Sequence, residues 1–147
     1  MAPEWWGQLR HWLSEFHRVR PLYDGDFFPL TDFTLSSFDW IGWQLHRGDI
    51  GHGMLQLFRR GNSSLVSTTV PIFGLQPAAR YNVTGWGGVG TAGVVESGQT
   101  LRSGLAVSLP PPPAGCKNND FNPNKTTGWT FTSCGSAAII EYQLVGA

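Results

Sequence analysis

The sequence predicts a mainly β protein: an antiparallel β-sandwich preceded by one amphipathic α-helix. Three observations support this fold class. Apolar residues recur at three- and four-residue steps over residues 4–19, which is typical of a helix. After Pro21, short apolar runs recur about every ten residues with Gly and Pro between them, as in sandwiches and barrels. The 147 residues are 41% hydrophobic, which is enough for one domain with its own core.

The predicted helix carries an unusually aromatic stripe. Pro3 suits its first position and Pro21 is expected to end it. Packing against a core is the favoured role. A membrane-surface helix is the alternative, and it is less favoured because the polar face mixes both signs of charge. The stripe consists of Trp5, Trp6, Leu9, Trp12, Leu13, Phe16 and Val19.

Each short apolar run after Pro21 is expected to form one strand. Asp24-Gly25-Asp26 is interpreted as a turn, and Arg47–Gly51 has the length of a hairpin connection. Pro71 within one run favours an edge strand or a bulge. The expected strands cover residues 27–30, 40–46, 54–59, 65–73, 80–84, 105–109 and 137–145.

Two segments interrupt this rhythm. Residues 85–93 contain five glycines and are expected to form a flexible loop. Residues 110–136 begin with four prolines, continue as an Asn-rich stretch, and are interpreted as a surface insertion between the last two strands.

Charge and hydropathy exclude several classes of protein. Ten Lys and Arg residues balance ten Asp and Glu residues, so the basic surface of a nucleic-acid binder is not expected. No apolar run approaches the ~18–20 residues that cross a bilayer, and the charged, Trp-rich first residues do not resemble a signal peptide. Thirteen of the twenty charged residues fall within the first sixty positions, which suggests a piece of a larger protein.

No self-contained catalytic, cofactor or metal site is predicted. Gly85, Gly87 and Gly90 match the dinucleotide-binding spacing, but the helix and the acidic residue that should follow are missing. Asp24 and Asp26 lack the further oxygen ligands of a calcium loop and are better explained as turn residues. His46 and His52 flank the hairpin connection and could converge, but two histidines without a third ligand make a weak zinc site.

Cysteines and glycosylation motifs favour an oxidising compartment. Cys116 and Cys134 flank the insertion, and a disulfide between them is favoured over two buried thiols because that segment has few apolar residues. N-glycosylation motifs begin at Asn62, Asn82 and Asn124. We therefore expect a secreted, lumenal or lysosomal protein.

Three aromatic residues are expected in loops: Trp86, Phe121 and Trp129. Exposed aromatic rings can stack on the CH-rich face of a sugar, so Trp86 and Trp129 are candidate carbohydrate contacts. Packing within the loops is the simpler interpretation.

The sequence resembles one enzyme family over nearly its whole length, most specifically up to Arg60. Residues 20–31 (RPLYDGDFFPLT) resemble the segment that leaves the last catalytic-barrel helix in α-galactosidases of glycoside hydrolase family 36. Residues 39–47 (DWIGWQLHR) and 53–60 (GMLQLFRR) are similar to the first two strands of that family's C-terminal domain. A looser similarity to the family's later strands is found in residues 81–84, 97–101, 104–110 and 138–142. Residues 85–93 and 110–136 fall outside the family's pattern.

The resemblance implies a non-catalytic region of a larger enzyme. The parent would hydrolyse terminal α-galactosides with retention, using two aspartates of an upstream (β/α)8 barrel that have no counterpart here. Residues 1–22 would be the last barrel helix, and residues 23–147 the C-terminal sandwich. The barrel would be the partner, and Trp5, Trp6, Leu9, Trp12 and Phe16 would pack against it. The alternatives are a stand-alone carbohydrate-binding module and, less favoured, an independent hydrolase.

Overall fold

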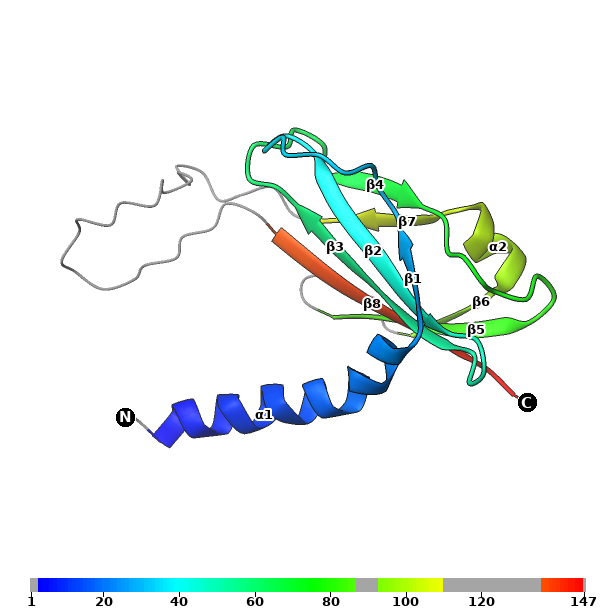
Figure 1. Ribbon diagram of the computed structural model, residues 1–147, viewed down its shortest axis with the longest axis horizontal. Helices are drawn as coiled ribbons and strands as arrows, with labels where there is room; N and C mark the ends of the chain where they lie inside the picture. The colour runs from blue at the N-terminus through cyan, green and yellow to red at the C-terminus, as the bar shows by residue number, and fades with distance from the viewer. Residues whose placement is uncertain (1–2, 87–92, 110–135, 147) are drawn as a thin grey trace.

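The structure, a computed structural model, describes residues 3–86, 93–109 and 136–146. It is mainly antiparallel β with one N-terminal amphipathic helix, so the predicted fold class is confirmed (Figure 1). Helix α1 spans Pro3–Val19 and continues into the 3-10 helix η1, Arg20–Asp24. The strands and the second helix follow as β1 (Asp26–Pro29), β2 (Trp40–Arg47), β3 (His52–Arg59), β4 (Ser67–Val70), β5 (Arg80–Trp86), β6 (Val94–Ser97), α2 (Gly98–Ser103), β7 (Leu105–Ser108) and β8 (Ser136–Leu144).

Two sheets form the sandwich in the described part of the chain. The larger sheet has six antiparallel strands in the order β1-β2-β3-β8-β5-β6, and the smaller pairs β4 with β7. Strand β8, near the end of the chain, therefore lies at the centre of the larger sheet between β3 and β5. Figure 1 shows the β4–β7 pair and α1 on opposite sides of this sheet.

Alternation along the strands gives the larger sheet two different faces. We call the core face the one that carries Leu55, Leu57 and Ile140, which pack against Val70 of β4 and Val107 of β7 in the main hydrophobic cluster. The opposite face, which we call the outer face, carries a smaller cluster of buried residues that includes two residues of α1 and η1: Val19, Leu22, Leu45 and Met54.

Every expected strand is found within a few residues of its predicted position, but the later part of the chain needs corrections. The predicted loop at 85–93 is wrong for its first two residues, because Gly85 and Trp86 pair with β8 as the last residues of β5. Residues 97–101 were matched to a strand, whereas most of them form α2. The predicted insertion at 110–136 is one residue too long, because Ser136 begins β8.

Three local predictions are confirmed by the backbone. Pro21 ends the α-helix, which gives way to η1 after Val19. The hairpin connection between β2 and β3 contains Gly51 with φ 58°, a conformation that favours glycine, and a Cβ there would lie 2.7 Å from the Cβ of Leu144. Strand β4 ends at Val70, directly before Pro71, as expected for a residue that cannot donate a backbone hydrogen bond.

Candidate functional site

The first candidate site is the apolar face of α1, which the fold leaves uncovered. Its six large side chains are each between 47% and 66% exposed. A contiguous apolar patch on a soluble protein is a typical mark of an interaction surface. We call this patch the helix stripe, and it consists of Trp5, Trp6, Leu9, Trp12, Leu13 and Phe16. Among the described residues, no helix is long and apolar enough to cross a membrane.

The end of α1 is fixed to the outer face by ion pairs. Nη1 of Arg18 donates to both carboxylate oxygens of Glu141 in β8, at 2.6 and 2.8 Å, and Nη2 of Arg18 donates to Glu15 at 2.9 Å. Nε2 of His52 lies 2.9 Å from the same Glu141 carboxylate. Burial alone would raise the pKa of Glu141, but the hydrogen bonds from His52 and Arg18 outweigh it and lower this pKa to about 2.

Apolar contacts reinforce this attachment only at the C-terminal end of the helix. Val19 and Leu22 are 5% and 1% exposed, whereas the helix stripe is not buried. Figure 1 shows α1 diverging from β8 toward its N-terminus. The outer face beyond the attachment also carries accessible aromatic residues: the rings of Trp43 and Phe58 lie 5.3 Å apart, and Phe58 is exposed.

A buried polar network lies on the core face. Nε2 of Gln44 donates to the hydroxyl of Tyr142 at 2.7 Å and to the carbonyl of Phe73 at 2.8 Å, and the amide of Phe73 donates to Oε1 of Gln44 at 2.9 Å. The Tyr142 hydroxyl lies 2.9 Å from Nδ1 of His46. Since that hydroxyl accepts from Gln44, it donates its own proton to Nδ1, which assigns the single N–H proton of the neutral ring to Nε2. The network ties the connection between β4 and β5 to the sheet.

The environment of His46 favours the neutral imidazole. Burial lowers its pKa below the usual 6.5, although Asp26, Asp49 and a hydrogen bond to the backbone of Gly74 act in the opposite direction. Burial also raises the pKa of the neighbouring Tyr142 phenol, so its proton is retained. Both groups are therefore uncharged near neutral pH.

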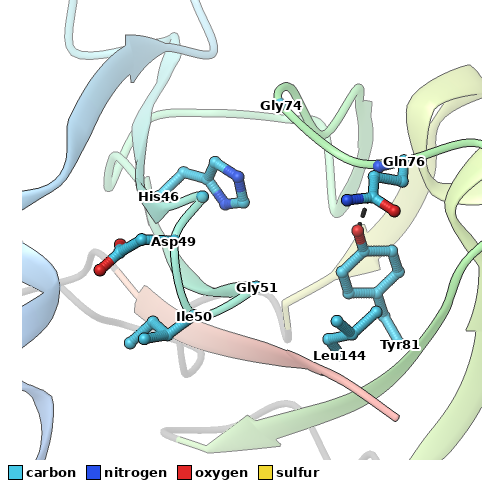
Figure 2. A pocket seen from close by; sticks show the side chains of 9 residues that line it. His46, Asp49, Ile50, Gly51, Gly74, Gln76, Tyr81 and Leu144 are labelled. Carbon is cyan, nitrogen blue, oxygen red and sulfur yellow. Dashed lines mark hydrogen bonds between the residues drawn. The ribbon is translucent and has the colours of Figure 1, made fainter. Parts of the chain in front are cut away.

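A pocket of about 410 Å³ opens beside this network. Figure 2 shows it with His46 of β2 and Gly51 of the β2–β3 connection on one side, and with Gln76, Tyr81 and Leu144 on the other. The backbone amide of Gln76 donates to the Tyr81 hydroxyl at 3.1 Å across the rim. The carboxylate of Asp49 points away from the opening and accepts two hydrogen bonds from Arg47, at 2.8 and 2.7 Å.

The two histidines of the hairpin do not converge, so the zinc hypothesis is wrong for this pair. His46 is paired with Gly53, and His52 with Arg47, which places the two rings on opposite faces of the sheet. Within the described ranges, no group of three or more His, Cys, Asp or Glu residues has the arrangement of a metal site. Asp24 ends η1 and Asp26 begins β1, on either side of Gly25.

The other sequence-predicted residues are only partly within the described chain. Asn62 and Asn82 are exposed, and the side-chain amide of Asn62 donates to the Ser37 hydroxyl at 2.9 Å. Trp86 is a strand residue rather than a loop residue, and its side chain lies outside the described part. Five further predictions lie outside the described residues: Cys116, Phe121, Asn124, Trp129 and Cys134.

Sequence reasoning missed the residues that organise both candidate sites. Glu141 and Tyr142 were read only as members of the last strand, and Gln44 as part of an apolar run. One signal was present: Glu141 and Gln44 are polar residues directly flanked by apolar or aromatic residues within their strands, and buried polar side chains require partners. No protein-family model and no curated protein matches this chain.

Proposed function

We propose that this chain is the non-catalytic C-terminal region of a glycoside hydrolase related to the family 36 α-galactosidases. In this proposal the helix stripe packs against a catalytic (β/α)8 barrel, and the sandwich supports that barrel. The supporting observation is that six large apolar side chains on one face of α1 stay about half exposed, although Arg18 and Val19 hold the end of the same helix in place. A helix that is anchored at one end and carries an exposed apolar face along its length is suited to packing against a second domain.

The segments that resemble the family agree with this assignment. Residues 39–47 and 53–60, which are similar to the first two strands of the family's C-terminal domain, form the paired strands β2 and β3. Residues 20–31, which resemble the chain leaving the last barrel helix, form η1 and β1 directly after α1. Activity would then belong to the barrel, whose two catalytic aspartates have no counterpart in this sequence.

Complementation tests the proposal. The barrel domain of a family 36 α-galactosidase, truncated before its last helix, is mixed with residues 1–147, and hydrolysis of a chromogenic α-galactoside is measured. We expect the mixture to form a complex by analytical ultracentrifugation and to gain activity, whereas the chain alone has none. A chain with Trp5→Gln, Trp12→Gln and Phe16→Gln should lose both complex and activity.

The control makes the same kind of change, to Gln, at two exposed apolar residues away from α1. Phe33 and Leu35 are 84% and 86% exposed in the β1–β2 connection. Phe33→Gln with Leu35→Gln should leave the complex intact. Equal binding by the wild-type chain and the triple variant, or turnover by the chain alone, would contradict the proposal.

A further inference from the structure

The pocket beside His46 has the size of a small-molecule site. Its volume of about 410 Å³ lies within the range of about 300–1,000 Å³ that is usual for ligand pockets. Its walls come from five parts of the chain: the end of β2, the β2–β3 connection, the β4–β5 connection, β5 and the end of β8. Such convergence of segments far apart in sequence gives a ligand several independent contacts.

Glycines allow these walls to approach one another. Gly74 has φ 76°, and a Cβ there would lie 2.5 Å from the His46 ring, so only glycine allows the β4–β5 connection to lie against the imidazole. Gly48 has no such restriction: its Cβ would meet Nε2 of His46 at 3.6 Å, an ordinary contact. The pocket can therefore be filled from position 48 without strain on the backbone.

The lining contains polar groups, but no charged side chain among the lining residues points into the pocket. The Asp49 carboxylate points toward Arg47 rather than into the opening, and the buried His46 has a lowered pKa and is neutral. An anionic ligand would therefore find no cation, and a cationic ligand no carboxylate directed at it. These properties favour a neutral ligand, because a charged one would lose its hydration without a compensating partner.

Donors and acceptors alternate with apolar surface around the pocket. The Gln76 side chain offers an amide that both donates and accepts, and the Tyr81 hydroxyl, which accepts from the Gln76 backbone, can donate its own proton. Ile50 and Leu144 add apolar surface to the lining. A sugar ring has this same combination of hydroxyl groups that donate and accept and CH-rich faces.

We propose that this pocket binds a neutral, polyhydroxylated ligand of monosaccharide size, with Gln76 and Tyr81 as its hydrogen-bonding side chains. The site lies on the core-face side of the sheet, away from the helix stripe. It does not depend on the proposed barrel partner, so the two proposals can fail separately.

NMR titration of the full 147-residue chain tests this site. Amide signals of the ¹⁵N-labelled protein are followed as D-galactose or D-glucose is added to roughly 50 mM, a range suited to a Kd on the order of 1–10 mM. We expect saturable shifts with a single Kd at Gly48, Gly51, Gly74 and Gln76. No shifts, or shifts that spread over the surface without saturating, would overturn the proposal.

Charged sugars test the ligand class. D-galacturonate and D-galactosamine should bind at least about threefold more weakly than galactose, since a charged group loses hydration without a partner. Tighter binding of either one would contradict a site for neutral ligands.

Two pairs of variants test the location. Gly48→Val fills the pocket and should weaken binding at least about tenfold, whereas Gly7→Val in α1, where a Cβ would meet nothing within 4 Å, should not. Gln76→Ala should weaken binding about two- to tenfold, the loss expected for one or two hydrogen bonds, and exposed Gln99→Ala should have no effect. Unchanged binding in Gln76→Ala would overturn the assignment even if Gly48→Val failed to fold.

Discussion

At the scale of single residues, His46 is the group whose protonation the fold opposes. Its Nδ1 lies 2.9 Å from the Tyr142 hydroxyl, and that hydroxyl already accepts a hydrogen bond from Gln44. A proton on Nδ1 would therefore compete with Gln44 for the Tyr142 oxygen and would leave the Tyr142 hydroxyl proton without Nδ1 as its acceptor. The imidazole is also only 4% exposed, so its charged form would lose most of its hydration.

Stability is therefore predicted to fall in mild acid because of His46. Its pKa is lower in the folded chain than the usual 6.5, so the unfolded chain binds the proton more readily. The stabilisation is fully present above pH 6.5 and is lost as the pH falls below that value, by at most about 1.4 kcal/mol per pH unit. Urea unfolding measured from pH 7.5 to pH 5 checks this dependence.

The matched variant is His46→Gln, which cannot titrate. Its free energy of unfolding should be lower at pH 7.5 but less dependent on pH down to pH 5. Glu141 does not interfere in this interval, because its pKa is lowered from 4.5 to about 2 and its contribution is lost only below pH 4.5. Parallel pH profiles for the wild type and His46→Gln would show that another group is responsible.

The sequence could not indicate this network. His46 and Tyr142 are 96 positions apart, and they meet because β3 lies between β2 and β8 in the sheet. Periodicity identifies which residues share a face of one strand, but strand order decides which strands are neighbours. The hypothesis that paired His46 with His52 used nearness in sequence, and the alternation of side chains separates them.

At the scale of elements, one carboxylate connects α1 to the centre of the larger sheet. Glu141 binds Arg18 of α1 and His52 of β3 from its place in β8, and its side chain is 12% exposed. A charge-assisted hydrogen bond is stronger than a neutral one, whereas Arg18 is 45% exposed and its pairing is weakened by solvent. The attachment of the helix end is thus specific but modest in energy.

Glu141→Gln should loosen the end of α1 without unfolding the sandwich. Replacing the carboxylate removes the charge that both Arg18 and His52 face, at a cost of about 1 kcal/mol after allowance for solvent. Tryptic cleavage after Arg18 should become about three- to tenfold faster. The control is Asp39→Asn, which removes the charge of an exposed carboxylate that accepts from Thr34 at the other end of β2, and it should not change the cleavage rate. Equal rates in all three proteins would contradict this role.

Which elements the sequence predicts depends on their length and surroundings. Strands β2 and β3 have eight residues each and are separated by a glycine-containing connection, so both were found within two residues of their ends. Helix α2 has six residues and buries only Gly98 and Leu101, too few to create a helical period. Its one sequence signal is the cap at Ser97, whose hydroxyl accepts from the amide of Thr100 at 3.1 Å.

At the scale of the whole molecule, the uneven distribution of charge has a structural explanation. Several of the charged residues in the first sixty positions hold connections rather than cover a surface. Arg59 donates to the carbonyl of Leu65 at 2.9 Å, and Arg60 donates to the carbonyl of Thr34 at 2.8 Å. Arg47 reaches the carbonyl of Pro21 at 3.0 Å. Arg47 and Arg60 thus fix connections between η1 and the first three strands, and Arg59 fixes the connection that follows β3.

The same distribution of contacts predicts that most of α1 is dispensable for folding. A chain that begins at Ser14 lacks most of the helix stripe but keeps Arg18, Val19 and Leu22, so its free energy of unfolding in urea should stay within about 1 kcal/mol of the full chain. A chain that begins at Tyr23 also loses Val19 and Leu22, which are 5% and 1% exposed, and should be less stable by about 3–5 kcal/mol. Binding of a hydrophobic dye should decrease strongly in the first truncation, because the exposed tryptophans are removed. If the first truncation unfolds instead, the stripe contributes to the stability of this domain itself, and a face kept apolar for a separate barrel would no longer explain it.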